Sequence, residues 1–234
     1  MTYKTDQNSE KKIRVRRIFE SIAYRYDLLN HLLSFGTDYY WRKKAISLTK
    51  LSPGSILLDV ACGTGDFAIE AKRSGANNII GADFSINMLK LFNKKCSWIA
   101  GRNVQMVAEN MPLKNSSVTN ITVAFGVRNF YDIQKGFDSF YNVLKNNGRV
   151  TILEFRIPSN FIFKRLYKLY FKKILPVVGG LISGDRDAYN YLPKSVEDFD
   201  EKIDLEKLLL NSGFKKIEKY NLTLGIAQTI IATK

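Results

Sequence analysis

Two acidic residues flank a glycine turn at the point where an apolar run gives way to a helical pattern. The turn reads CGTGD over residues 62–66, and Asp59 lies inside the apolar run that precedes it. Glycines allow positive φ and let a ligand approach the backbone, and the helix that follows offers free N–H groups. Carboxylates beside the turn suit a ligand with a positive charge, such as an ammonium or a sulfonium, and they repel a pyrophosphate.

A third acid follows the next apolar run. Asp83 ends that run 18 residues after Gly65, where a carboxylate can accept hydrogen bonds from both hydroxyls of a ribose. Asp66 adds negative charge directly after the glycines, although it could instead be a helix N-cap. Ala68 stands where the dinucleotide fingerprint has its third glycine, and because that fingerprint tolerates alanine the position decides little. The acids therefore favour S-adenosylmethionine over a dinucleotide.

The elements that must position these residues alternate regularly from residue 56 onwards. Short apolar runs alternate with amphipathic segments, which predicts a parallel sheet with helices on both faces. Two strand patterns near the C-terminus predict an antiparallel end to the sheet. We expect strands at 56–61, 78–83, 104–109, 120–125, 149–155, 214–220 and 224–232, and helices near 66–74, 86–97 and 133–146.

A single domain accounts for the whole chain of 234 residues, of which 45% are hydrophobic. We expect an α/β fold with a doubly wound, mostly parallel sheet of seven strands. The first 12 residues form a frayed tail in this interpretation. The expected parts are an N-terminal helical cap (1–50), a cofactor-binding core (51–155), an inserted helical lid over the substrate (156–200), and a C-terminal helix and strands (201–234).

The segment that breaks the alternation contains a basic amphipathic helix. Over residues 161–175, Lys164, Arg165, Lys168 and Lys172 share one side, and aromatic and aliphatic side chains occupy the other. Such a helix docks on an anionic membrane, or packs on its own domain with a solvated basic face. It could also build a homodimer interface. The net charge of +14 fits an anionic partner, but a composition rich in both Lys and Asn explains it equally well.

Composition also excludes several classes of protein. No apolar run reaches 18 residues, so we expect no membrane-spanning helix. The polar N-terminus lacks a signal-peptide core, so we expect a cytoplasmic location, at the inner face of the membrane if the basic helix docks there. One histidine, His31, and two cysteines do not make a metal cluster or a disulfide framework, and we expect no metal.

Several motifs resemble one known family. LLDVACGTGDF (57–67) with GADFS (81–85) is similar to the first two motifs of class I methyltransferases, which are Rossmann-like and use S-adenosylmethionine. Three further stretches narrow the resemblance to the UbiE/MenG/COQ5 family of quinone-ring C-methyltransferases, from about residue 14 to the C-terminus. They are FESIAYRYDLLNHLLSFGTDYYWRKKAI (19–46), ITVAFGVRNFYD (121–132) and GDRDAYNYLPKSVEDF (184–199).

The resemblance implies methylation of a ring carbon on a prenylated quinol. In the menaquinone branch of the family the acceptor is demethylmenaquinol, and in the ubiquinone branch it is a methoxybenzoquinol. We expect the menaquinone branch, because the chain lacks the extended N-terminus of organellar relatives. An enzyme that accepts both quinols is the alternative.

The resemblance also places residues on the cofactor. Relatives often have a polar residue where this chain has Val107, so adenine would be held by apolar contact and backbone groups. Relatives often have Ser where this chain has Ala124, whose contact could only be through the backbone. The expected cofactor-binding residues are Asp59, Gly63, Thr64, Gly65, Asp83, Val107, Ala108 and Ala124.

The expected catalytic residues lie outside the cofactor motifs. Arg128 follows the fourth strand, at the edge of the sheet where open α/β folds bind ligands; it cannot act as a base, but it can orient a water or stabilise a phenolate. Asn129 would share that site, and Tyr26 could bond the methionyl carboxylate or the quinol. His31 is a candidate base, or else a packing histidine. Residues expected to line the substrate are Asp185, Tyr189 and Tyr191.

Other functions remain as alternatives to this interpretation. A nucleic-acid methyltransferase would explain the basic charge, but residues 124–130 read AFGVRNF where amino-directed base methylases have an Asn/Asp-Pro-Pro-aromatic run. Neither Cys62 nor Cys96 is placed to be the nucleophile of a pyrimidine methylase, so we expect no nucleic-acid partner. The remaining alternatives are a cofactor-binding protein without turnover and a small-molecule O-methyltransferase, which would need a metal or a clear base.

Overall fold

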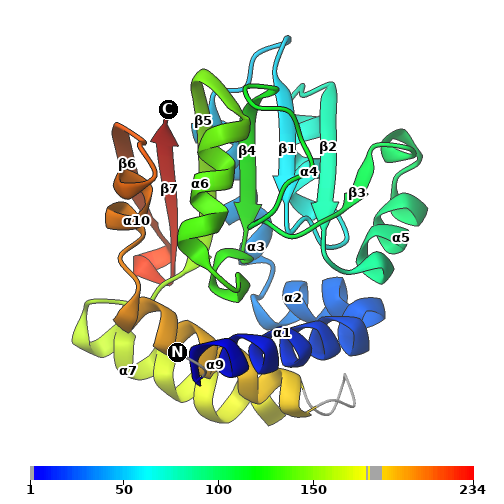
Figure 1. The fold of residues 1–234 in the computed structure, drawn as a ribbon. Coiled ribbons are helices and arrows are strands. Elements are labelled where there is room, and N and C mark those ends of the chain that lie inside the picture. Colours follow the sequence, from blue (N-terminus) through cyan, green and yellow to red (C-terminus); the bar gives the residue numbers. More distant parts are fainter. Residues whose placement is uncertain (1–2, 178, 180–185) are drawn as a thin grey trace.

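A seven-stranded sheet lies at the centre of the molecule (Figure 1). The structure is a computed structural model that describes residues 3–177, 179 and 186–234, with side chains described outside 3–12 and 186–190. The strand order is β3-β2-β1-β4-β5-β7-β6. The strands are β1 (Ile56–Val60), β2 (Asn78–Asp83), β3 (Asn103–Gln105), β4 (Val118–Ala124), β5 (Leu144–Phe155), β6 (Lys216–Leu222) and β7 (Ala227–Thr233).

The pairing of these strands confirms the doubly wound α/β fold. The first five strands are parallel, and β7 runs antiparallel to both β5 and β6. The chain order reverses between β1 and β4, and such a switch point opens a crevice at the carboxyl ends of the strands. The third strand is shorter than the expected 104–109. Its last residues leave the sheet, and Val107 instead forms an isolated bridge with Asn110.

Helices cover both faces of the sheet, as the alternating pattern predicts. One face carries α3 (Thr37–Thr49), α4 (Asp66–Arg73) and α5 (Ile86–Lys95), with the fully buried Phe92 at its centre. The opposite face carries α6 (Ile133–Val143) and α10 (Leu205–Asn211). Phe137 and Phe140 are three residues apart, so they share one side of α6, and both are completely buried against the sheet.

A third layer of helices lies across the carboxyl ends of the parallel strands (Figure 1). It contains α1 (Tyr3–Ile22), η1 (Ala23–Arg25), α2 (Tyr26–Leu33), α7 (Phe161–Leu169), the π-helical turn η4 (Tyr170–Ile174) and α9 (Arg186–Lys202). Its apolar core includes Ile18, Leu29, Phe171 and Val196. The expected frayed tail is wrong for residues 3–12, because α1 begins at Tyr3. None of the helices in the described ranges is long and apolar enough to cross a bilayer.

Candidate active site

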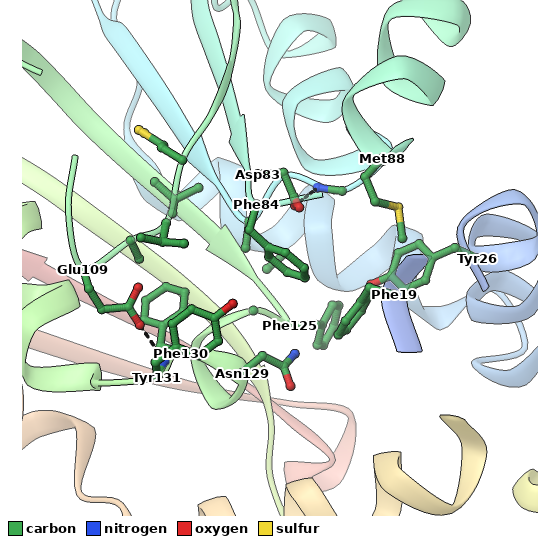
Figure 2. A pocket seen from close by; sticks show the side chains of 18 residues that line it. Phe19, Tyr26, Asp83, Phe84, Met88, Glu109, Phe125, Asn129, Phe130 and Tyr131 are labelled. Carbon is green, nitrogen blue, oxygen red and sulfur yellow. Dashed lines mark hydrogen bonds between the residues drawn. The ribbon is translucent and has the colours of Figure 1, made fainter. Parts of the chain in front are cut away.

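The crevice at the switch point holds a pocket whose wall includes side chains from the N-terminal helices (Figure 2). Its walls come from the ends of β1, β2 and β4 and from the loop after β3. Phe19 and Tyr26 reach it from α1 and α2. The pocket therefore joins the sheet to the N-terminal helices, and a ligand inside it would contact both.

Asp83 is the buried acid that faces this pocket. One carboxylate oxygen accepts a hydrogen bond from the Gly63 N–H at 2.8 Å, and the other accepts one from the Ser85 N–H at 2.8 Å. Burial raises the pKa of Asp83 to about 6; the two N–H groups oppose the shift, and the nearby charge of Glu20 adds to it. The carboxylate can still accept hydrogen bonds from a ribose, because it is ionised at neutral pH.

Both glycines of the turn have a left-handed backbone conformation, and Gly63 lines the pocket. Gly63 has φ 54° and Gly65 has φ 90°, a region that side chains rarely adopt. Gly65 also lacks room, because a Cβ there would lie 2.1 Å from the ring of Phe92. Ala61 takes a positive φ of 51° despite its Cβ, and it too lines the pocket. The conformation of the turn therefore allows its backbone to contact a ligand in the pocket.

The far end of the pocket is apolar, as the residues at 107 and 108 predict. Val107, Ala108 and Ala124 all line the pocket, as does Phe84 after β2. Met88 lies beside Phe19 at the other end of the pocket (Figure 2). Glu109 also lines the pocket, but its carboxylate accepts hydrogen bonds from the backbone N–H groups of residues 131 and 132. An apolar wall of this kind suits the flat face of an adenine ring.

Asp59 and Thr64 do not line the pocket. Asp59 is fully buried behind it in β1, where Oδ1 accepts a hydrogen bond from the Thr122 hydroxyl at 2.8 Å. Burial raises the pKa of Asp59 to about 7. Thr64 donates its hydroxyl to the carboxylate of Asp27 on α2. The structure therefore places these two expected cofactor residues in supporting positions.

These features fit S-adenosylmethionine. Asp83 matches the ribose hydroxyls, the apolar wall matches adenine, and the glycine turn offers backbone to the remainder. The aromatic rings of Phe19, Tyr26 and Phe125 lie at the other end of the pocket (Figure 2). Aromatic faces attract cations, and these rings are placed to receive a sulfonium.

A second cavity continues from that aromatic end. It shares Phe19, Tyr26 and Phe125 with the first pocket, and it extends between α2, α3 and the end of β5. Polar side chains face it, although most of its wall is apolar. They are Asn30, Ser34, Asp38, Arg42, Arg128 and Tyr191.

Arg128 is a fixed cation in the wall of the second cavity. Its guanidinium donates to Glu154 Oε1 at 2.7 Å and to the Phe125 carbonyl, and its carbon lies 5.6 Å from the centroid of the Phe155 ring. Arg128 is only 8% exposed and Glu154 is fully buried. A buried, paired guanidinium holds its position and can stabilise negative charge that develops beside it.

Some of the other expected catalytic and substrate-lining residues lie close together in this region. The Tyr191 hydroxyl donates to Asn129 Oδ1 at 2.9 Å, which links α9 to η3 (Val127–Asn129). Tyr26 stands between the two cavities, and burial raises its pKa although Arg128 opposes the shift. Asp185 and the side chain of Tyr189 lie outside the described residues.

The sequence as a whole matches a known family. Residues 4–234 match the model of the ubiE/COQ5 methyltransferase family. The chain belongs to that family. It is a methyltransferase, and S-adenosylmethionine is its methyl donor.

Individual relatives cover almost the whole chain. A protein of Geotalea daltonii named ubiquinone/menaquinone biosynthesis C-methyltransferase UbiE is 44% identical over 97% of this chain and 98% of its own. The demethylmenaquinone methyltransferase of Chlorobaculum tepidum is 38% identical over 100% of this chain and 97% of its own. A solved methyltransferase of Thermotoga maritima, 19% identical, has a TM-score of 0.68 over 93% of this chain and 99% of that one, which shows a shared fold.

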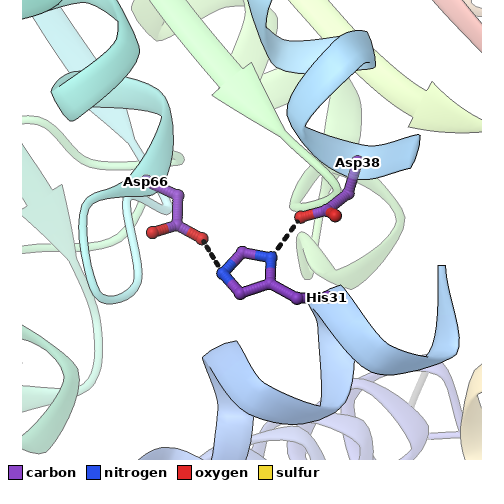
Figure 3. A group of neighbouring side chains, drawn as sticks. All are labelled: His31, Asp38 and Asp66. Carbon is purple, nitrogen blue, oxygen red and sulfur yellow. Dashed lines mark hydrogen bonds and ion pairs between the residues drawn. The ribbon is translucent and has the colours of Figure 1, made fainter. Parts of the chain in front are cut away.

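In this family member, His31 lines neither of the two cavities. It lies between Asp38 and Asp66 (Figure 3). Its Nδ1 is 2.7 Å from Asp38 Oδ2, and its Nε2 is 3.5 Å from Asp66 Oδ2. Carboxylates therefore face both ring nitrogens of His31. His31 does not line the second cavity, where Arg128 and Tyr26 lie. Three such side chains could group around a metal ion. Arg42 already pairs with both carboxylates, however, and Lys95 pairs with Asp66, so a further cation would be repelled.

Sequence reasoning missed several residues of the methyltransferase's second cavity. Asp38 is 2% exposed and pairs with Arg42 one helical turn later, and neither was singled out. Their spacing of four residues was the available signal. Glu154, the partner of Arg128, was also missed. The available signal was an acid within the apolar stretch 152–155 at the end of β5, because a buried charge needs a partner.

Proposed function

We propose that this methyltransferase acts on a ring carbon of a prenylated quinol, with demethylmenaquinol as the first-choice acceptor and a benzoquinol as the alternative. The observation that carries the proposal is the pair of joined cavities, with a cofactor pocket on one side and a buried arginine on the other. The names of the relatives from Geotalea daltonii and Chlorobaculum tepidum point to the same acceptors.

The acceptor must be the reduced ring, because its carbon is the nucleophile. A quinol hydroxyl pushes electron density into the ring, and it does so more strongly once it has lost its proton. Bound S-adenosylmethionine supplies an electrophilic methyl group on a sulfonium. The ring carbon forms a bond to that methyl group while the sulfur–methyl bond breaks and S-adenosylhomocysteine leaves. The carbon then loses its own proton to restore aromaticity, so one proton is released overall.

The residues of the chain orient the acceptor and stabilise its charge. Phe19, Tyr26 and Phe125 border both cavities, so they can hold the ring carbon close to the methyl group, at about 3–3.5 Å in a reactive complex. Arg128 stabilises the phenolate, and its burial strengthens that interaction. Tyr191 holds the amide of Asn129 through its hydroxyl. The helical layer excludes bulk water from the junction.

A turnover assay with two quinols tests this function. Purified protein is mixed with S-adenosylmethionine and chemically reduced demethylmenaquinone, with the benzoquinol in parallel, and mass spectrometry detects ring methylation. Arg128→Ala should lower kcat by about 10²–10³ with little change in cofactor affinity. Arg73→Ala is the matched control, since that side chain is 68% exposed on α4. If cofactor binds but neither quinol is methylated, the proposed acceptor class is wrong.

We also propose that the enzyme reaches its lipid acceptor at an anionic membrane surface, from the cytoplasmic side. Apolar side chains of α2 and α7 are exposed, among them Leu28, Leu32, Phe161 and Ile162. Basic residues 164, 165 and 173 are exposed beside them. Lys168 and Lys172 instead pair with Glu197 of α9, so part of the basic side serves packing. A homodimer through the same surface is the alternative.

A further inference from the structure

A third cavity continues from the acceptor cavity and leads to the surface of the helical layer. It has a volume of about 370 Å³. Five residues line both it and the acceptor cavity, so the two cavities adjoin. These shared residues are Asn30, Ser34, Trp41, Phe155 and Leu192.

The wall of this third cavity is almost entirely apolar. No charged side chain lines it among the described residues. Among the few polar groups, the Trp41 indole donates to the Thr223 hydroxyl at 2.7 Å and the Thr37 hydroxyl donates to the Ser34 carbonyl at 2.6 Å. The buried Tyr167 hydroxyl has no hydrogen-bond partner among the described residues. The cavity therefore offers few hydrogen bonds to an occupant, and burial of hydrocarbon is the main interaction available to it.

The cavity is held open between α2 and the π-helical turn after α7. The Tyr170 hydroxyl donates to the Leu33 carbonyl at 2.6 Å, which ties η4 to the end of α2. The rings of Tyr167 and Phe171 stack with centroids 4.0 Å apart, and they form part of the wall. A π-helical turn is rare, and it is frequent at functional sites.

The mouth of the cavity opens on the exposed apolar face of the helical layer. Phe35 is 83% exposed, Leu166 is 56% exposed and Phe163 is 37% exposed, and all three line the cavity. An occupant that extends past them leaves the protein among exposed apolar side chains and enters an apolar environment outside. This arrangement is expected for a ligand that is longer than the cavity.

We propose that the third cavity is a groove for the polyprenyl tail of the acceptor whose ring occupies the second cavity. The groove begins where the acceptor ring must lie, it is lined by hydrocarbon, and it ends at an apolar surface. A headgroup with a hydrocarbon tail is the one ligand shape that fills both cavities at once. This inference rests on the proposed quinol substrate, and it assigns the tail a site of its own.

A comparison of acceptors with and without a tail tests the groove. Wild-type protein should show kcat/KM that rises with the number of prenyl units until the groove is filled. Leu33→Trp fills the groove from α2, so the ratio of kcat/KM for a tailed naphthoquinol over a tail-less one should fall about tenfold. Leu210→Trp is the matched control, because Leu210 is 50% exposed on α10 and does not line the groove.

A second pair of variants tests the groove independently, in case Leu33→Trp does not fold. Leu166→Asp places a charge at the mouth and should lower the same ratio, whereas Leu210→Asp on α10, at a site that is 50% exposed, should not. All assays use detergent without vesicles, so membrane binding does not contribute. The inference is overturned if wild-type kcat/KM is independent of tail length, or if the groove and control variants give equal ratios. If no quinol is methylated at all, the proposed function itself fails.

Discussion

At the scale of single residues, the buried acids of the two cofactor motifs have different surroundings and therefore different roles. Asp83 ends its strand and faces the cofactor pocket, where two backbone N–H groups hold it. Asp59 lies within its strand, and its Oδ2 has no hydrogen-bond partner in the part of the chain that the structure describes. Burial raises the pKa of both, to about 6 and about 7 respectively. Each value leads to a separate prediction.

Cofactor affinity should fall in acid because Asp83 must be ionised to accept hydrogen bonds from the ribose. Its pKa of about 6 means that the carboxylate is charged at pH 7.5 and mostly protonated at pH 5. We therefore expect the Kd for S-adenosylmethionine to rise about tenfold between pH 7 and pH 5, as measured by calorimetry. The Asp83→Asn variant should bind S-adenosylmethionine weakly, and its Kd should depend less on pH.

Glu20→Gln is the sharper control for this pH dependence. The charge of Glu20 contributes to the raised pKa of Asp83. Glu20 accepts hydrogen bonds from Ser85 and Asn87, and a glutamine can accept from Asn87 through its oxygen and donate from its NH2 to the Ser85 hydroxyl. The midpoint of the affinity profile should therefore move to lower pH in this variant. An unmoved midpoint, or an Asp83→Asn variant with an unchanged profile, would assign the titration to another group.

Asp59 should make the fold less stable as the pH rises. Its folded pKa of about 7 exceeds its ordinary value of 3.8, so the folded state binds the proton more tightly than the unfolded state. The resulting stabilisation is complete below pH 3.8 and is lost as the pH rises through 7. Asp59→Asn removes the buried charge, and at pH 8 we expect it to raise the free energy of unfolding by about 1–3 kcal/mol.

Urea unfolding of the cofactor-free protein measures this difference. The gain from Asp59→Asn over wild type should grow between pH 4 and pH 7 and then level off. Thr122→Val is a useful companion, because it removes the hydroxyl that donates to Asp59 without removing the charge. A gain that is the same at every pH would contradict the assignment.

At the scale of elements, the N-terminal helices are fastened over the cofactor pocket by a few polar contacts. Asp27 of α2 accepts hydrogen bonds from Thr64 in the glycine turn and from Lys95 of α5, the latter at 2.8 Å. Glu20 of α1 accepts one from Ser85 at 3.0 Å. Because Phe19 and Tyr26 form part of the pocket wall, these contacts connect closure of the cap with retention of the cofactor.

Asp27→Ala should therefore speed cofactor release more than it lowers stability. The Asp27–Lys95 pair is about a third exposed, and such pairs contribute under about 1 kcal/mol to folding. We expect the dissociation rate of S-adenosylmethionine to rise about tenfold in stopped-flow experiments, with a melting temperature within a few degrees of wild type. Asp198→Ala, which breaks an exposed pair within α9, is the control. Equal dissociation rates in the two variants would exclude this role for the cap.

The elements also show what the sequence could and could not predict. Periodicity identified the alternating strands and helices, and the turn at 62–66 and Asp83 were found because their backbone and charge requirements are local. The orientation of Asp59 could not be predicted, since a strand residue can point to either face of the sheet. His31 was a candidate base because imidazole is versatile, but its partners Asp38 and Asp66 come from separate helices that no local pattern connects. Long-range pairing of this kind is fixed only when the layers pack.

At the scale of the whole molecule, three cavities form a continuous series from the sheet to the outer helices. The first adjoins the second through Phe19, Tyr26 and Phe125, and the second adjoins the third through Trp41 and Phe155. The series ends on the face of α2 and α7 that exposes apolar and basic side chains. A soluble cofactor and a lipid acceptor could therefore reach the junction from different environments, and under the proposed docking α7 would face the membrane.

Vesicle binding should consequently depend on both charge and apolar side chains. We expect the protein to sediment with vesicles that contain equal parts of phosphatidylcholine and phosphatidylglycerol, and to remain in solution with phosphatidylcholine alone. Each basic residue near an anionic surface contributes about 1 kcal/mol, and high salt screens that attraction. Phe161→Ser with Ile162→Ser should weaken binding, because these side chains are 77% and 65% exposed on α7.

The control for the vesicle experiment carries the same changes on another surface. Ile86→Ser with Leu210→Ser alters side chains that are 40% and 50% exposed on α5 and α10, away from the mouth of the groove. If both double variants bind vesicles alike, attraction comes from the net charge of +14 as a whole and not from a docking face. Light scattering without lipid separates the remaining case: if α7 instead joins two copies, wild type is a dimer and the α7 variant is a monomer.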